Sequence, residues 1–74
     1  MHMEGFKIKA YGKSELALMY FPEAMPAAAL RRLSNWIRNC RGLSDSLLEA
    51  GYDKRSKYLT PRQVEIIIGM LGEP

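Results

Sequence analysis

Residues 30–41, LRRLSNWIRNCR, carry the side chains in this chain that are best suited to binding chemistry. They include four arginines and two asparagines, and no aspartate or glutamate occurs between residues 26 and 44. Arginine and asparagine form bidentate hydrogen bonds with the edges of guanine and adenine. Solvent-exposed helix faces ordinarily mix charges of both signs, so this acid-free segment favours an anionic partner such as double-stranded DNA.

Helical spacing separates the polar side chains of this segment from its apolar ones, at about 100° per residue. The apolar side of such a helix contains Leu30, Leu33, Trp36, Ile37 and Cys40, and the polar side contains Arg31, Arg32, Asn35, Arg38 and Asn39. We expect Arg31, Asn35 and Arg38 to contact base edges and Arg32 to contact phosphates. The alternative is that the polar side only keeps an amphipathic helix in solution.

A second basic segment, Lys54-Arg55-Ser56-Lys57, follows further along the chain. In a winged-helix arrangement, a basic loop after the helices contacts phosphates beside the DNA groove, which is the role expected for Lys54, Arg55 and Lys57. The alternative is a solvated hairpin tip. Residues 30–62 contain eight basic and three acidic residues, whereas the rest of the chain contains three basic and five acidic ones. This uneven charge again favours an anionic partner.

The residue types needed for enzyme chemistry are scarce. The chain has one cysteine, Cys40, and one histidine, His2. Metal sites need clusters of cysteine, histidine and carboxylate, and a nucleophilic cysteine needs a nearby base. We therefore expect a protein that is not an enzyme and has no metal, no cofactor and no small-molecule substrate. Cys40 lies on the apolar side of its predicted helix, where we expect it to act as a small buried hydrophobe.

The sequence contains no apolar run long enough to span a membrane and no signal peptide with a basic start and an apolar middle. A single cysteine cannot form an intramolecular disulfide, which excludes a disulfide-stapled secreted protein. We expect a cytoplasmic protein with no membrane partner.

Local patterns predict a short strand over residues 6–11, with Phe6, Ile8 and Ala10 on one face. A short helix then follows the N-cap residue Ser14 and stops before Pro22. A longer helix begins at Pro26 and ends at residues 41–42, where Gly42 is the expected C-terminal cap.

A third helix is predicted over residues 45–50, with Ser44 as its N-cap and with Leu47 and Leu48 facing inward. Residues 52–57 form a polar loop, and residues 57–59 a short strand in which Tyr58 and Leu59 cannot both face the core. The next segment, Thr60-Pro61-Arg62-Gln63, is a capping box that starts a final helix, which Gly72 ends.

These elements predict a mainly α fold: a single small domain over residues 6–74 with about four helices, a helix-turn-helix-like core and at most a minor two-stranded β ribbon. Residues 1–5 are expected to be a disordered N-terminus or the remnant of a tag. The leading functional hypothesis is a small DNA-binding regulatory or accessory domain.

The alternative functional hypothesis is a protein–protein interaction module, homodimeric or with another protein partner, that binds no nucleic acid. Trp36 borders the apolar stripe and is expected to belong to the core, but it marks an interface if it is exposed. The surface of such a module would use Trp36, Met19, Phe21, Ile66 and Met70.

Over residues 6–74 the chain resembles a family of short bacterial proteins of unknown function found mainly in Bacteroidetes. The residues that carry the resemblance are Tyr11-Gly12-Lys13, Glu15-Leu16-Ala17, Tyr20-Phe21-Pro22, Leu33, Trp36-Ile37, Gly51-Tyr52, Thr60-Pro61-Arg62-Gln63-Val64 and Leu71-Gly72-Glu73-Pro74. This resemblance implies no particular activity.

The chain is also loosely similar to excisionase and MerR-type helix-turn-helix domains. In that comparison Glu15-Leu16-Ala17 resembles the start of the first helix, residues 31–38 the DNA-contacting helix, and residues 54–60 the wing.

Overall fold

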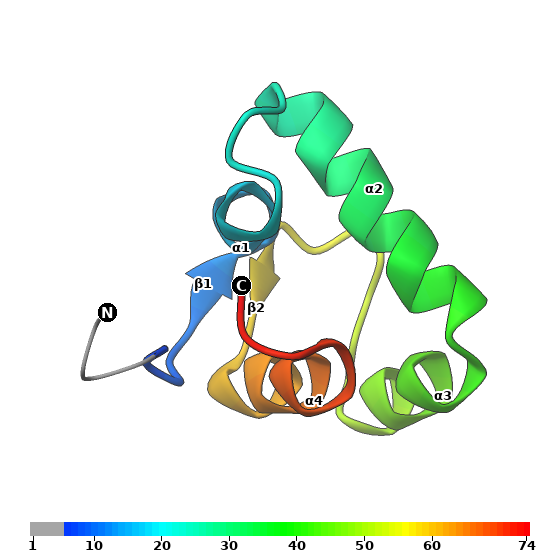
Figure 1. The fold of residues 1–74 in the computed structure, drawn as a ribbon. Helices are drawn as coiled ribbons and strands as arrows, with labels where there is room; N and C mark the ends of the chain where they lie inside the picture. Colours follow the sequence, from blue (N-terminus) through cyan, green and yellow to red (C-terminus); the bar gives the residue numbers. More distant parts are fainter. Residues whose placement is uncertain (1–5) are drawn as a thin grey trace.

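Four helices and a two-stranded ribbon make up the fold in a computed structural model that describes residues 6–74 (Figure 1). The elements in chain order are β1 (Tyr11–Gly12), α1 (Lys13–Tyr20), α2 (Pro26–Asn39), α3 (Arg41–Glu49), β2 (Tyr58–Leu59) and α4 (Pro61–Leu71). The predicted class, mainly α with a minor ribbon, is confirmed. Residues 1–5, for which we expected a disordered or tag-derived segment, lie outside the described residues.

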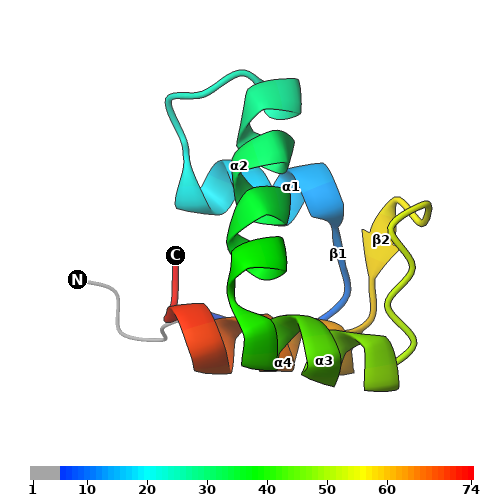
Figure 2. The same cartoon turned by 90° about the vertical axis from the view of Figure 1, so that its right-hand side faces the viewer.

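Helix α2 runs across the other three helices. Figure 1 views α1, α3 and α4 nearly end-on, whereas α2 lies across the view. Figure 2 shows α2 upright, with α1 crossing it behind and α3 and α4 side by side beneath it. Helix α1 packs mainly on α2, and α3 connects α2 to α4. The strands pair as the expected ribbon, and the pairing is antiparallel, with Tyr11 opposite Leu59 and Gly12 opposite Tyr58.

Every helix and both strands contribute to the hydrophobic core. The fully or almost fully buried apolar residues are Tyr11, Leu16, Ala17, Ala29, Leu33, Ile37, Leu43, Leu47, Leu59, Val64 and Ile67. Leu59 is buried and Tyr58 is exposed, as expected for neighbouring residues of a strand.

Several predicted helix ends are confirmed. The Thr60 Oγ1 atom accepts a hydrogen bond from the Gln63 backbone N–H at 3.2 Å, and Gln63 Oε1 accepts one from the Thr60 N–H at 3.1 Å. These two bonds complete the capping box of α4. Pro26 occupies the first turn of α2. Gly51 and Gly72 have φ values of 84° and 88° after α3 and α4, a conformation that glycine adopts without steric cost.

The predicted strand over residues 6–11 is wrong in length and in register. Only residues 11 and 12 pair, Ile8 is 44% exposed, and Tyr11 is buried instead. The Tyr11 hydroxyl donates a hydrogen bond to the Lys7 carbonyl at 2.9 Å, so the chain before β1 folds back toward its own strand. Strand β2 offers only two residues, and a longer β1 would have no partner for its backbone groups.

Helix α1 begins two residues before the predicted start. Its N-cap is Gly12, not Ser14, and the Gly12 N–H donates to Glu15 Oε1 at 3.1 Å. The Glu15 carboxylate therefore satisfies the backbone of the cap residue from inside the first turn.

The predicted boundary between α2 and α3 is also wrong. Cys40 is extended, with φ −103° and ψ 98°, and it both ends α2 and caps α3. Gly42 consequently lies inside α3 and does not cap α2. The earlier start of α3 places Leu43 and Leu47, four residues apart, in the core, and it leaves Leu48 63% exposed where we expected burial.

Candidate nucleic-acid interface

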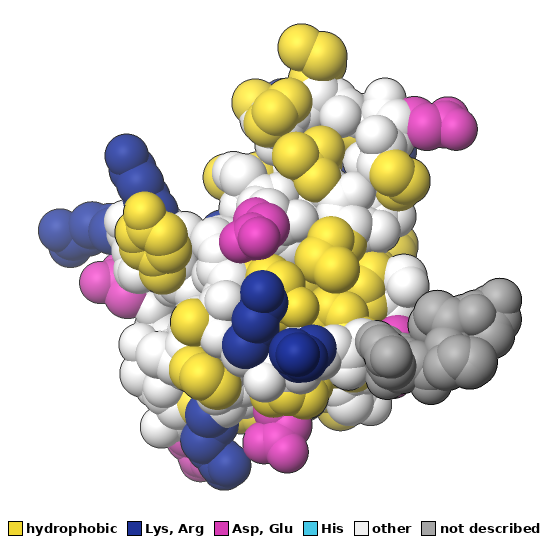
Figure 3. Space-filling view, turned by 90° about the vertical axis from the view of Figure 1, so that its left-hand side faces the viewer, with side chains coloured by type: hydrophobic (Ala, Val, Ile, Leu, Met, Phe, Trp, Pro, Cys, Tyr) yellow, Lys and Arg dark blue, Asp and Glu magenta, His cyan; other side chains and the backbone are white. Residues whose placement is uncertain are grey.

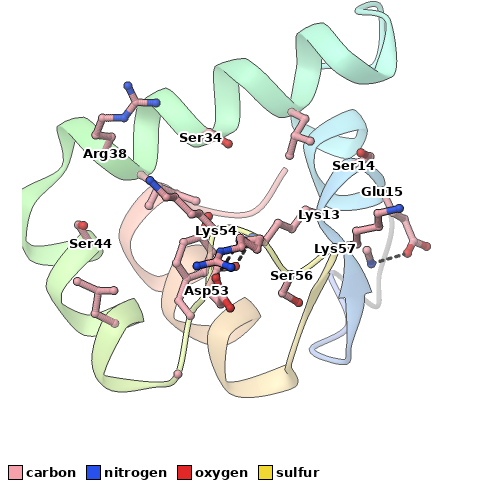
Figure 4. A pocket seen from close by; sticks show the side chains of 17 residues that line it. Lys13, Ser14, Glu15, Ser34, Arg38, Ser44, Asp53, Lys54, Ser56 and Lys57 are labelled. Atoms are coloured by element: carbon pink, nitrogen blue, oxygen red, sulfur yellow. Dashed lines mark hydrogen bonds between the residues drawn. The ribbon is translucent and has the colours of Figure 1, made fainter.

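A wide, open groove of about 1270 Å³ lies between one edge of α2 and the loop formed by residues 51–57, which we call the basic loop (Figure 4). Leu30, Ser34, Ile37 and Arg38 supply the wall from α2, and these positions share one face of a helix. Gly12 and the first turn of α1, Ser44 and Leu48 of α3, and every residue of the basic loop complete the lining. We call this edge of α2 the groove edge.

Lys13, at the start of α1, donates two hydrogen bonds to the basic loop. Its backbone N–H donates to the Lys57 carbonyl at 2.9 Å, and its Nζ donates to the Asp53 carbonyl at 2.7 Å. The same Nζ lies 4.3 Å from the centre of the Tyr52 ring, a cation–π distance. Lys13 is only 7% exposed. The loop has no helix or strand within it, and these contacts give it a defined position.

The surroundings of Lys13 and Tyr52 change their acid–base properties. Burial lowers the pKa of the Lys13 ammonium below its ordinary value of 10.5, and the Asp53 carboxylate partly opposes this by favouring the charged form. Burial also raises the pKa of the Tyr52 phenol. Both shifts come from burial, since each ionised form loses contact with water.

Both carboxylates of the groove make hydrogen bonds to backbone amides. Glu15 accepts from the Gly12 N–H, and Asp53 Oδ1 accepts from the Arg55 N–H at 2.9 Å. Arg38 from α2 is exposed at the rim of the groove, and so are Lys54, Arg55 and Lys57 of the basic loop. Figure 4 shows Arg38 on α2, with Lys54 and Lys57 on the loop side of the groove. The rim is therefore predominantly cationic.

The seven residues predicted to bind nucleic acid fall into three places. Four of them line the groove, namely Arg38, Lys54, Arg55 and Lys57. Arg31 and Asn35 are exposed on α2, and with Arg38 they fall within about 60° of one another around the helix. They extend the groove edge toward solvent.

Arg32 lies elsewhere. Its guanidinium carbon is 5.6 Å from the centre of the Phe21 ring, and both residues line a separate, smaller hollow beside the 21–25 turn. The structure thus separates Arg32 from the groove, whereas six of the predicted residues lie in the groove or next to it.

No sequence pattern indicated the role of Lys13 or of the hydroxyls of Ser14, Ser34, Ser44 and Ser56, which also line the groove. A lysine is almost never buried unless it is paired, and the partners of Lys13 are 39 and 40 residues away, so no local pattern points to it. Serine hydroxyls are common phosphate contacts, but isolated serines carry no sequence signal of their own.

The opposite edge of α2 is aromatic. The Trp36 ring packs edge-on against the rings of Phe21 and Tyr20, with 4.8 Å and 5.9 Å between the ring centres. Trp36 is 42% exposed, so the expectation that it belongs to the core is wrong. It also borders a shallow hollow with Cys40 and Met70. We call the surface formed by Tyr20, Phe21, Trp36, Cys40 and Met70 the aromatic edge.

Tyr20 connects the aromatic edge to the residues that follow α4. Its hydroxyl donates a hydrogen bond to the Gly72 carbonyl at 2.5 Å. Burial raises the pKa of Tyr20 to about 12, and the negative charge of Glu73 adds to the shift.

Residues 6–74 contain no group of three or more histidine, cysteine or acidic side chains that could hold a metal ion. Within the same residues, every helix is too short or too polar to cross a membrane.

These features define a small helical domain with a ribbon and a cationic groove. Over residues 7–74 the chain matches the profile of a family described as "Domain of unknown function (DUF4248)", and it belongs to that family. No curated protein matches the chain, and no solved structure matches it either.

Proposed function

We propose that this domain binds double-stranded DNA through the groove edge of α2 and the basic loop. The observation that supports this most directly is the meeting of Arg38 from α2 with Lys54, Arg55 and Lys57 from the loop around one groove. The loop cations would contact phosphates and fix the orientation of the domain, and α2 would lie against the base edges. The proposal involves no catalytic step, metal, cofactor or small-molecule substrate.

The helix arrangement supports a helix-turn-helix mode of binding. Helix α1 crosses α2 steeply, and the 21–25 turn joins them (Figures 1 and 2). Helix-turn-helix domains pack two helices in this way and place the second in the major groove. The exposed stripe of Arg31, Asn35 and Arg38 offers the side chains that form bidentate contacts with guanine and adenine. The basic loop would act as the wing.

We propose a structural role for Arg32 in place of the phosphate contact expected from the sequence. Its position against Phe21 favours packing over phosphate binding. The cytoplasmic location and the Bacteroidetes origin remain predictions from the sequence.

Comparing Arg38 with Arg32 tests the proposal within one helix. After selection of a preferred site from random duplexes, Arg38→Ala should weaken binding to that site by about 1–3 kcal/mol and relax the preference for the contacted base. Arg32→Ala removes the same charge from the aromatic edge and should leave affinity and base preference nearly unchanged. Equal losses in the two variants would indicate only a general charge effect, and an unchanged Arg38→Ala variant would remove Arg38 from the interface.

The aromatic edge supports a second candidate function, that of a protein-interaction module. Trp36 is 42% exposed, and Met19 and Met70 are 41% and 51% exposed. Of the other residues expected on this surface, Phe21 and Ile66 are half-buried. Exposed tryptophan and methionine are enriched at protein interfaces. Light scattering across a concentration series tests self-association: a dimer that Trp36→Ala dissociates supports this candidate, and a monomer at every concentration rules out the homodimer.

A further inference from the structure

Tyr58 is an exposed aromatic residue that the packing of the fold does not explain. Its neighbour Leu59 is buried, whereas Tyr58 is 72% exposed on the outer side of the ribbon. Its partner across the ribbon is Gly12. Cross-strand pairs of side chains stabilise a ribbon, but glycine offers no side chain, so the Tyr58 ring has no neighbour on the opposite strand. The ring therefore contributes little to the stability of the ribbon.

The backbone that carries Tyr58 is nevertheless well held. The Ser56 hydroxyl donates to the Tyr58 carbonyl at 3.1 Å and accepts from the Tyr58 N–H at 3.3 Å. Directly before Tyr58, the Lys57 carbonyl accepts the Lys13 N–H. An aromatic ring on a fixed backbone has only two side-chain torsions left to order when it binds a ligand, so binding costs it little conformational entropy.

The charges around this ring indicate what it would bind. Lys54, Arg55 and Lys57 precede Tyr58 in the chain, and all three are exposed. At the left edge of Figure 3, dark-blue basic side chains lie above and beside an isolated hydrophobic one, with one magenta acidic side chain below it. A nucleotide matches this combination, because its base offers a π face to the ring and its phosphate offers negative charge to the cations. Single-stranded nucleic acid is bound by this pairing of stacking aromatics and basic grooves.

We propose that Tyr58 stacks on an unpaired base, so that the domain prefers a duplex with a short single-stranded extension to a blunt duplex. A base inside a duplex is already covered on both faces by its neighbours, whereas an unpaired base in an extension is free to receive the ring. This inference rests on the proposed function, because the groove and the loop cations hold the adjoining duplex while Tyr58 engages the extension.

Fluorescence anisotropy with two labelled probes, a blunt duplex and the same duplex with a short thymine extension, tests this inference. Stacking of a base on an aromatic side chain contributes about 1–3 kcal/mol, so the wild-type protein should bind the extended probe at least about fivefold more tightly. Tyr58→Phe keeps the ring and should keep the preference. Tyr58→Ser should lose most of it, while binding the blunt duplex as well as the wild type does and with the same salt dependence.

An extension also adds phosphates, and their contribution should remain in Tyr58→Ser, which retains every cation. If this variant keeps the full preference, or if the wild type binds both probes equally, the stacking role is wrong although the proposed function stands. If the wild type binds neither probe at low salt, the proposed function fails and the inference fails with it. The thermal midpoint of Tyr58→Ser should match that of the wild type, which shows that the comparison measures binding and not folding.

Discussion

The two solvent-facing edges of α2 differ in chemistry although one helix carries both. Trp36 lies about 160° from Arg38 around the helix. At the groove edge, Arg38 faces a loop that supplies three more cations. At the aromatic edge, Trp36 packs on Phe21 and Tyr20, and Arg32 lies over the Phe21 ring. The arginines of the two edges therefore have different surroundings, one polar and cationic and the other aromatic.

The difference shows that an arginine-rich helix does not identify its own binding residues. Arg32 and Arg38 both belong to the polar side of the predicted helix, and both were expected to contact DNA, Arg32 at phosphates and Arg38 at base edges. Segments distant in the sequence distinguish them, namely the 21–25 turn beside Arg32 and the basic loop beside Arg38. The local pattern gives the polarity of a face, and the tertiary partners decide which part of it can hold a ligand.

Neutralising the basic loop beside the groove edge should have the largest effect. The combined variant Lys54→Gln, Arg55→Gln and Lys57→Gln should bind a DNA duplex roughly 10- to 100-fold more weakly at about 50 mM salt. Its salt dependence, the slope of log K against log salt, should become shallower by about three if each cation contacts one phosphate. All three side chains are exposed, so the thermal midpoint should change little. Unchanged binding would show that the two edges do not differ in function.

Removing the Trp36 ring should lower the stability of the fold and leave DNA affinity nearly unchanged. Trp36→Ala loses the contacts with Phe21 and Tyr20 and should lower the free energy of unfolding by about 1–2 kcal/mol, less than for a fully buried tryptophan because the ring is half-exposed. Urea denaturation measures this loss. Affinity for DNA should stay within about twofold of the wild type where the folded state dominates. A large loss of DNA affinity in the folded protein would extend the interface to the aromatic edge.

Helix α4 packs on α3 and β2 and supplies no residue to the groove, so a change at its start should lower stability without altering either edge directly. Thr60→Ala removes the hydroxyl that accepts the Gln63 N–H and should destabilise the domain by about 1 kcal/mol. The loss should appear as a lower urea midpoint with an unchanged denaturant slope. Thr60→Ser, which keeps the hydroxyl, should retain most of the stability. If both variants lost the same amount, the hydrogen bond would not be the cause.

The smallest effect should come from Tyr20, and it should depend on pH. Tyr20→Phe loses the hydrogen bond to the Gly72 carbonyl and should cost about 0.5 kcal/mol near neutral pH. The fold raises the pKa of Tyr20 from 10.0 to about 12, so between these values the folded protein keeps a proton that the unfolded chain releases. The stability of the wild type should therefore fall as pH rises through this window.

The Tyr20→Phe variant serves as the control for this pH effect. Denaturation at several pH values above 9 should show a shallower alkaline loss in Tyr20→Phe than in the wild type. Tyr52 also has a raised pKa, so part of the loss should remain. Identical slopes in the two proteins would show that Tyr20 titrates alike in the folded and unfolded states.

The sequence predicts the fold well where local chemistry determines it. The capping box at Thr60, the proline that starts α2 and the glycine after α4 each satisfy backbone groups within a few residues. Two of the errors lack such a local determinant, whereas the start of α1 was misplaced although its cap contact, from the Gly12 N–H to Glu15, is local. The length of β1 depends on β2, and the extended conformation of Cys40, which places Gly42 inside α3, has no local signal.

The candidate site follows the same rule. The polar stripe of Arg31, Asn35 and Arg38 and the basic loop were both predicted, because charge and helical period are local properties. The groove between them could not be predicted, since it depends on Lys13, whose ammonium binds the Asp53 carbonyl and lies on the Tyr52 ring. The separation of Arg32 from the groove likewise depends on Phe21, which belongs to a different segment.

The most direct test of the central claim is fluorescence anisotropy of a labelled random-sequence duplex with the wild-type protein, at about 50 mM and about 200 mM salt. If the three cations of the basic loop each contact a phosphate, affinity should fall roughly 40-fold between the two conditions, because each contact releases a counterion. Such a slope would make the groove edge a DNA-binding surface. Absence of binding at the lower salt, or binding that salt does not weaken, would contradict the account and leave the aromatic edge as the functional surface to test.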